Sequence, residues 1–212
     1  MNFLEKRILA EGVIKEGNIL KVDSFLNHQI DIDVMRGIAE ELQCRFAGKD
    51  FNKILTIEAS GIAIATLLGH LCHVPVVFAK KSETANSTDD KYLSQAYSFT
   101  HKRVNGVFIS RPYLHGTDRV LIVDDFLADG EAAHALIDLV NQAGGTVVGI
   151  GIAIEKGQQG GGTALRNEGY CLESIAVVEE MDWQTQTIRF RRQSEATPVC
   201  NSLSLMNENT DE

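Results

Sequence analysis

The sequence predicts an α/β protein built on an open, mostly parallel, twisted sheet that is flanked by helices. Two runs, residues 119–123 and 147–154, are rich in Val and Ile without polar alternation, as in parallel strands that are covered on both faces. Segments with the spacing of amphipathic helices separate such runs. The chain has 212 residues, which suits one large domain.

The N-terminal elements are short. Residues 3–11 are expected to form a helix, because Asn2 and Glu5 have the spacing of a capping box and Gly12 is a natural end. Residues 19–22 are expected to form a short strand, which a polar stretch follows.

The longer elements are expected to alternate between helix and strand. Residues 32–47 predict a helix, since apolar side chains recur every four residues and Gly48 follows. The remaining expected elements are strands at 53–57, 74–79, 119–123 and 147–154, and helices at 61–70 and 131–142.

One region interrupts this alternation. Residues 80–92 are polar and predict a mobile loop, and the strands at 93–100 and 107–110 predict a hairpin with a turn that contains Asn105 and Gly106. Residues 193–212 are rich in Ser, Asn and Glu, which predicts a disordered tail after a single domain of residues 1–192.

Composition narrows the classes of partner. A formal net charge of -9 argues against nucleic acid or an anionic membrane surface as the main partner. It is compatible with an anionic small molecule in a locally basic pocket. The four cysteines form no Cys-x-x-Cys pair, and neither a signal peptide nor an apolar stretch of about 20 residues is present, so we expect a cytoplasmic protein.

The most informative segment follows the apolar strand at 119–123. Asp124 and Asp125 end that strand, and their carboxylates can accept hydrogen bonds from the hydroxyls of a sugar. The next loop opens a helix, and its backbone N–H groups can cradle a phosphate. The alternative is that these acids only cap the helix. The loop consists of Ala128, Asp129, Gly130, Glu131 and Ala132.

Two other strand ends offer groups for an anion. The small residues Ala59, Ser60 and Gly61 let backbone N–H groups approach an anion closely, although such a turn is often only a connector. Lys80 and Lys81 end the next strand, where they can hold pyrophosphate oxygens or remain a solvated pair.

Lys156 follows the strand at 147–154. A cation at the end of a buried strand is costly unless it has a partner or faces a ligand, and the alternative is that its side chain extends to solvent. The glycine-rich run at 158–162 lacks the spacing of a dinucleotide fingerprint and predicts a flexible loop.

The segment 120–133 resembles the phosphoribosyl pyrophosphate motif of type I phosphoribosyltransferases: an apolar strand, two acids, and a loop of small residues that enters a helix. Residues 9–190 resemble the xanthine phosphoribosyltransferase family, most tellingly at 20–31. The segments 78–81, 97–100 and 149–156 also look like that family. The resemblance implies base contacts at Leu20, Asn27 and Lys156, and a small hood made of about residues 13–31 and 155–190.

The chain departs from the family pattern at four positions. Asp129, Glu131 and Ala132 stand where hydroxyl residues or glycine are common, so backbone donors are expected to hold the 5′-phosphate while the acids turn away. Gln158 stands where relatives tend to carry an aromatic residue.

The resemblance implies transfer of the 5-phosphoribosyl group from phosphoribosyl pyrophosphate to N9 of xanthine. Asp124 and Asp125 would hold the ribose and residues 128–132 the 5′-phosphate. The pyrophosphate group would be held by Ala59, Ser60, Gly61, Lys80 and Lys81. The donor is expected to arrive as its Mg²⁺ complex, with no metal held by the protein alone, and the chain to form a homodimer.

Two alternatives remain. One is a related enzyme that prefers guanine or hypoxanthine, because residue types alone do not select xanthine. The other is a regulator that senses phosphoribosyl pyrophosphate without catalysis, against which the acidic net charge stands.

Overall fold

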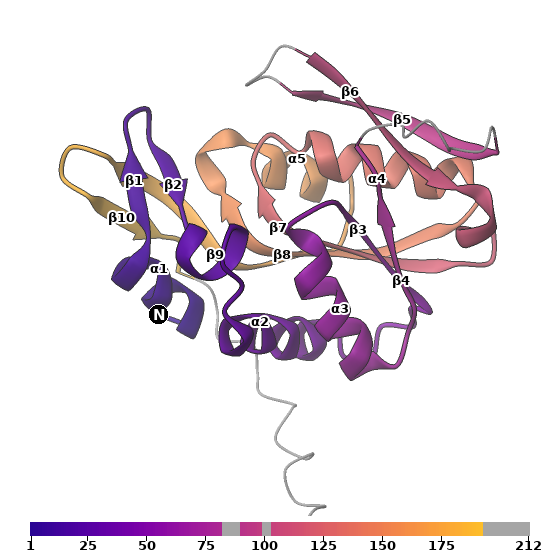
Figure 1. Cartoon of the computed structure of the whole chain (residues 1–212), viewed down its shortest axis with the longest axis horizontal. Coiled ribbons are helices and arrows are strands. Elements are labelled where there is room, and N and C mark those ends of the chain that lie inside the picture. The colour runs from indigo at the N-terminus through magenta and orange to yellow at the C-terminus, as the bar shows by residue number, and fades with distance from the viewer. Residues whose placement is uncertain (82–89, 99–102, 193–212) are drawn as a thin grey trace, which may run out of the picture.

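The computed structural model describes residues 1–81, 90–98 and 103–192. Its centre is a six-stranded sheet with the order β10-β9-β8-β7-β3-β4 (Figure 1). Five strands are parallel and β10 is antiparallel to β9, so the predicted fold class is confirmed. The strands are β3 (Lys53–Ile57), β4 (Val76–Ala79), β7 (Arg119–Leu127), β8 (Thr146–Lys156), β9 (Leu172–Asp182) and β10 (Thr187–Phe190).

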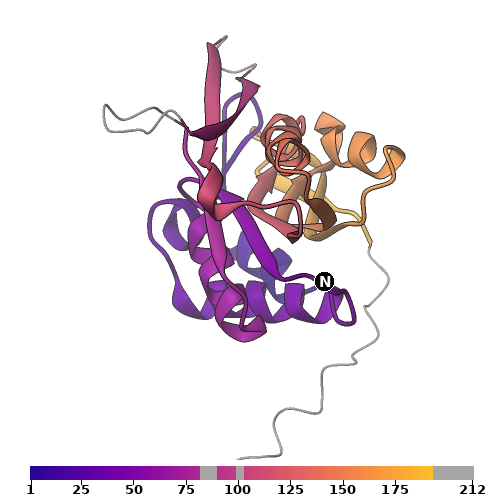
Figure 2. The same ribbon diagram turned by 90° about the vertical axis from the view of Figure 1, so that its right-hand side faces the viewer.

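Helices cover both faces of this sheet (Figures 1 and 2). One face carries α1 (Phe3–Glu11), α2 (Ile32–Arg45) and α3 (Gly61–Cys72), whose apolar side chains form one buried cluster with the sheet. The other face carries α4 (Glu131–Gln142) and α5 (Gly161–Asn167), which pack into a second cluster. None of the described helices is long and apolar enough to cross a membrane.

The N-terminal helix begins as predicted. The Asn2 side chain accepts a hydrogen bond from the Glu5 N–H at 2.9 Å, and the Glu5 carboxylate accepts one from the Asn2 N–H at 3.0 Å. A two-stranded hairpin, β1 (Val13–Lys15) and β2 (Ile19–Lys21), and a π-helix, η1 (Asp23–Asn27), come next. Sequence reasoning had predicted only the second strand of this hairpin.

The second hairpin consists of β5 (Lys91–Ser98) and β6 (Arg103–Ser110), and a 3₁₀ turn, η2 (Arg111–Tyr113), follows it. The predicted turn at Asn105 and Gly106 is wrong, because both residues lie inside β6, opposite Ala96 and Gln95. An Asn-Gly turn of the common hairpin type needs positive φ at both residues, and neither has it. Residues 82–89 of the predicted loop and the predicted tail at 193–212 lie outside the described residues.

The prediction of a flexible loop at 158–162 is also wrong. A 3₁₀ turn, η3 (Gly157–Gln159), leads into α5. A Cβ at Gly161 would lie 2.6 Å from the carbonyl oxygen of Ala128, and one at Gly162 would overlap the Glu155 carboxylate. These two glycines therefore permit close packing.

Strand order determines where a ligand can bind. β3 pairs with β4 on one side and with β7 on the other, so the order of the strands reverses between β3 and β7. Such a reversal leaves a crevice beyond the carboxyl ends of the two strands. The segments that follow β3 and β7 are those that carry Ser60, Gly61 and the predicted phosphate loop.

Candidate active site

Asp124 and Asp125 lie near the carboxyl end of β7, and each is only 9% exposed. Asp124 Oδ1 accepts a hydrogen bond from the Asp125 N–H at 2.9 Å. Burial raises the pKa of Asp124 well above its ordinary value and the charge of Asp125 adds to this rise, while Lys81 opposes it. The pair is therefore poorly neutralised by the protein and suited to a ligand that brings hydroxyl donors or positive charge.

This pKa shift has a consequence for stability. The pKa of Asp124 is higher in the folded chain than in the unfolded one, so between these two values the folded chain binds more protons. The free energy of unfolding therefore falls as the pH rises through that interval.

The turn after β3 touches the acid pair. Ser60 is the N-cap of α3 and Gly61 its first residue. A Cβ at Gly61 would overlap Thr56 Oγ1 and would lie 2.9 Å from Asp124 Oδ1. The turn and the acids are thus brought together as predicted, and only glycine allows the approach.

Sequence reasoning missed Thr56. Its hydroxyl is buried and has no hydrogen-bond partner among the described residues. A buried polar atom without a partner is rare in native structures and is often explained by a functional role. The available signal was a single polar side chain within the apolar run Ile54–Ile57.

Lys81 is tied to the same turn. Its backbone N–H donates to Glu58 Oε1 at 2.6 Å, and the peptide between Glu58 and Ala59 is cis. Lys80 is held differently, because its backbone exchanges two hydrogen bonds with that of Phe108 in β6. Both lysine side chains are exposed, and Lys81 is near enough to act on the pKa of Asp124.

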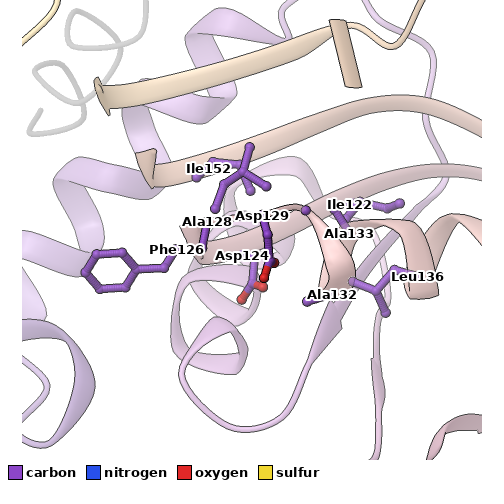
Figure 3. A pocket seen from close by; sticks show the side chains of 11 residues that line it. Ile122, Asp124, Phe126, Ala128, Asp129, Ala132, Ala133, Leu136 and Ile152 are labelled. Atoms are coloured by element: carbon purple, nitrogen blue, oxygen red, sulfur yellow. The ribbon is translucent and has the colours of Figure 1, made fainter. Parts of the chain in front are cut away.

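The predicted phosphate loop runs from the end of β7 to α4 and forms part of a pocket (Figure 3). Asp129 Oδ1 accepts a hydrogen bond from the Glu131 N–H at 3.2 Å. The expectation that both acids turn away is therefore wrong for Asp129, which covers one of the loop's own donors. The pocket is lined by Ile122, Asp124, Phe126, Leu127, Ala128, Asp129, Gly130, Ala132, Ala133, Leu136 and Ile152.

The N-terminal hood segment reaches the acid pair through Asn27, whose Nδ2 donates to Asp125 Oδ2 at 2.9 Å. Leu20 is different, because its side chain is 5% exposed and belongs to the core. Opposite it, the backbone N–H and C=O of Ile14 bond to the side chain of Gln186. Two residues that face each other in an antiparallel pair direct their backbone groups either both toward the partner strand or both away from it. The backbone groups of Ile14 point away from β2, so those of Leu20 point away from β1.

Lys156 ends β8 and is half-buried. Burial lowers the pKa of Lys156, and the charges of Asp125 and Asp129 only partly oppose this effect. Its Nζ lies 5.3 Å from the centre of the Phe126 ring. Sequence reasoning missed Phe126, although this residue lies inside the motif at 120–133. The side chain of Gln158, where relatives tend to carry an aromatic residue, is exposed.

In the part of the chain that the structure describes, there is no evident site at which protein side chains alone would hold a metal ion. There, no three His, Cys, Asp or Glu side chains group in a way that could hold a metal ion. The two carboxylates of Asp124 and Asp125 can still face a cation that brings its other ligands with it.

Comparison with known proteins agrees with this geometry. A family model described as a phosphoribosyl transferase domain matches residues 21–195. The xanthine phosphoribosyltransferase of Bifidobacterium longum is 52% identical over 192 residues, which cover 90% of this chain and 100% of the relative. That of Lachnoclostridium phytofermentans is 49% identical over 191 residues, which cover 90% of this chain and 98% of the relative.

Solved structures give the same fold at low identity. Adenine phosphoribosyltransferase from Rhodothermus marinus has a TM-score of 0.68 at 23% identity and covers 82% of this chain and 98% of its own. The enzyme from Giardia lamblia, complexed with 9-deazaadenine, has a TM-score of 0.68 at 17% identity, and the match covers 85% of this chain and 99% of that enzyme. Together with the sequence relatives, these matches show that the chain belongs to the xanthine phosphoribosyltransferase family, within the fold of the phosphoribosyl transferase domain.

Proposed function

We propose that the chain is a purine-salvage enzyme that transfers the 5-phosphoribosyl group from phosphoribosyl pyrophosphate to N9 of xanthine. The products are xanthosine 5′-monophosphate and pyrophosphate. The observation that carries this proposal is the close approach of Gly61 to Asp124, at the carboxyl ends of β3 and β7, in a chain about half identical to xanthine phosphoribosyltransferases.

The donor's three parts have separate places in this proposal. Asp124 and Asp125 accept hydrogen bonds from the ribose hydroxyls. The N–H groups of residues 128–132 and the start of α4 hold the 5′-phosphate, for which Asp129 must release the Glu131 N–H. Ala59, Ser60, Gly61, Lys80 and Lys81 hold the pyrophosphate group, with Lys81 anchored to the turn through Glu58.

The reaction breaks the bond from C1′ to the pyrophosphate oxygen and forms the bond from C1′ to N9, and the base loses a proton. Positive charge develops on the ribose ring while the leaving group gains negative charge. The buried acids face the first, and Lys81 with the backbone donors of the turn faces the second. Positioning of the two substrates and electrostatics then suffice, without a covalent nucleophile.

The donor is proposed to bind with Mg²⁺, which phosphoribosyltransferases generally use with this substrate. The fit rests on the two adjacent buried carboxylates of Asp124 and Asp125, whose like charges together favour a ligand with positive charge. When bound, the ion would neutralise part of the pyrophosphate charge. Asp124 and Asp125 would face the complex, and the ion's remaining ligands would come from the substrate and water.

The base site is proposed between the hood and the end of β8. Lys156 donates to a purine carbonyl or ring nitrogen, and Phe126 supplies an apolar ring beside it. Asn27 has a second N–H and a carbonyl oxygen left for the base after its bond to Asp125. Leu20 offers its backbone groups, because its side chain is buried.

Lys156→Ala is expected to raise the KM for xanthine by about tenfold while the KM for phosphoribosyl pyrophosphate changes much less, because the lysine would bind the base. Steady-state kinetics with each substrate varied in turn measure both constants. Lys91→Ala is the matched control, since Lys91 Nζ lies 5.4 Å from the centre of the Phe108 ring, outside the proposed site. An unchanged KM for xanthine in the Lys156 variant would contradict the role of Lys156.

The function itself is tested by measuring pyrophosphate release with phosphoribosyl pyrophosphate, Mg²⁺ and, in parallel, xanthine, guanine, hypoxanthine and adenine. The proposal predicts the highest kcat/KM with xanthine. Preference for guanine or hypoxanthine would keep the chemistry and reject the specificity. A folded protein that binds the donor but releases no pyrophosphate with any base would instead be a sensor.

Two further properties belong to the proposal. The enzyme would act in the cytoplasm, and the half-buried cysteines Cys72 and Cys171, which form no disulfide, suit a reducing compartment. It would act as a homodimer, as its family resemblance implies. Size-exclusion chromatography with light scattering would test this by measuring the mass of the protein in solution.

A further inference from the structure

A buried carboxylate lies directly before Lys156, the lysine that is proposed to bind the purine. Glu155 precedes Lys156 in β8 and is 1% exposed. Arg166 donates to both of its oxygens, at 2.9 Å from Nη1 and 2.7 Å from Nη2, and Ser174 Oγ donates at 2.6 Å. A bidentate pair with a third donor fixes the carboxylate in one orientation. The end of β8 is therefore held by side chains of α5 and β9.

Glu155 is ionised in this setting. Burial raises its pKa, but the hydrogen bonds from Arg166 and Ser174 and the charge of Arg166 outweigh that effect, so the pKa is lowered from its ordinary value. Buried ion pairs often contribute no more to stability than apolar side chains of similar volume would. Stability alone is therefore a weak reason for this pair, whereas its hydrogen bonds connect the end of β8 to α5.

The helix that carries Arg166 also touches the phosphate loop. The Gly161 N–H, at the start of α5, donates to the carbonyl oxygen of Ala128 at 3.1 Å. At the other end of α5, the Glu168 carboxylate lies 3.1 Å from Nε2 of His134, whose Nδ1 lies 2.9 Å from the carbonyl oxygen of Gly130. Both ends of α5 are thus connected to the loop.

We propose that Arg166 is a positioning residue. Through Glu155 and α5, it fixes Lys156 and the phosphate loop at 128–132 relative to each other. This inference rests on the proposed function, in which Lys156 holds the purine and the loop holds the 5′-phosphate. The separation of these two anchors sets how closely N9 approaches C1′. A misplacement of about 1 Å can cost about 100-fold in rate, so a rigid link between them matters for catalysis.

The test compares Arg166→Gln and Arg166→Lys with a matched buried ion pair elsewhere. Lys53 Nζ lies 2.6 Å from Asp118 Oδ2, at the amino ends of β3 and β7, where the proposed site is absent. Arg166→Gln is expected to raise the KM of both substrates by about tenfold and to lower kcat, with Arg166→Lys intermediate. Lys53→Gln is expected to lower the Tm while both KM values stay within about twofold of wild type.

Wild-type KM values in a folded Arg166→Gln protein, with only the Tm reduced, would overturn the proposal. If that variant does not fold, Arg166→Lys keeps the positive charge but loses the bidentate pair, and wild-type KM values there would overturn the proposal equally. Wild-type turnover is measured first, so that failure of the proposed function is recognised separately. In that case calorimetry with phosphoribosyl pyrophosphate replaces kinetics, and equal affinity in wild type and Arg166→Lys would count against the link.

Discussion

Asp125→Asn is expected to reduce kcat by about 100-fold or more, the scale seen when one preorganised electrostatic group is removed from a reacting centre. The substitution keeps the shape of the side chain and removes the charge that would face the ribose. Its side-chain oxygen can still accept the hydrogen bond from Asn27, so the fold is expected to persist. Steady-state kinetics and circular dichroism measure the two effects.

A second signature separates this electrostatic effect from general damage. The charge of Asp125 contributes to the raised pKa of Asp124, so its removal lowers that pKa. The acid limb of the pH profile of kcat/KM should therefore move to lower pH in the variant. Asp138→Asn is the control, since Asp138 lies on α4 and accepts a hydrogen bond from Gln142. Wild-type turnover in Asp125→Asn would refute the ribose assignment.

Gly61→Ala is expected to affect donor binding most. The added Cβ overlaps Thr56 Oγ1 and comes within 2.9 Å of Asp124 Oδ1, so the turn, the hydroxyl or the acid must move. Thr56 is fully buried, so its side chain would have to move within the protein interior. Overpacking of this kind costs about 1–3 kcal/mol of stability. Displacement of the turn from the acids should lower kcat/KM for phosphoribosyl pyrophosphate by about 100-fold.

Kinetics with varied phosphoribosyl pyrophosphate and thermal unfolding would be measured together. Gly106→Ala is the matched control, because among the described side chains a Cβ there meets only Leu93 Cδ1, at 3.6 Å, and the residue has no positive φ. It should change neither kcat/KM nor the Tm greatly. A Gly61→Ala enzyme with normal donor kinetics would show that the turn does not position the pyrophosphate group.

Local pattern was sufficient for much of the fold. β3 and α4 have the predicted boundaries. The pattern of apolar residues within each segment shows which of its side chains must be buried, and that pattern can be recognised in the sequence. The glycines at 161 and 162 misled, since glycine serves both flexible loops and close packing, and only the neighbours Ala128 and Glu155 decide between them. The Asn-Gly pair in β6 misled likewise, because the strand ladder determined its conformation.

The candidate site was partly readable for the same reason. The acids and the loop form one continuous segment, so their pattern could be recognised. Thr56 and Arg166 act through contacts between different elements, from Thr56 in β3 to Gly61 at the start of α3 and from Arg166 in α5 to Glu155 in β8. Such roles appear only when the chain is folded.

The hydrogen bond from Asn27 to Asp125 would make the two proposed substrate sites thermodynamically dependent on each other. One amide side chain would be shared by the acid proposed to face the sugar and by the space proposed for the base. Whichever substrate binds first restricts the rotamers of Asn27 and Asp125, and the second then loses less conformational entropy. Since such coupling is reciprocal, xanthine should strengthen binding of the donor by the same factor as the donor strengthens binding of xanthine.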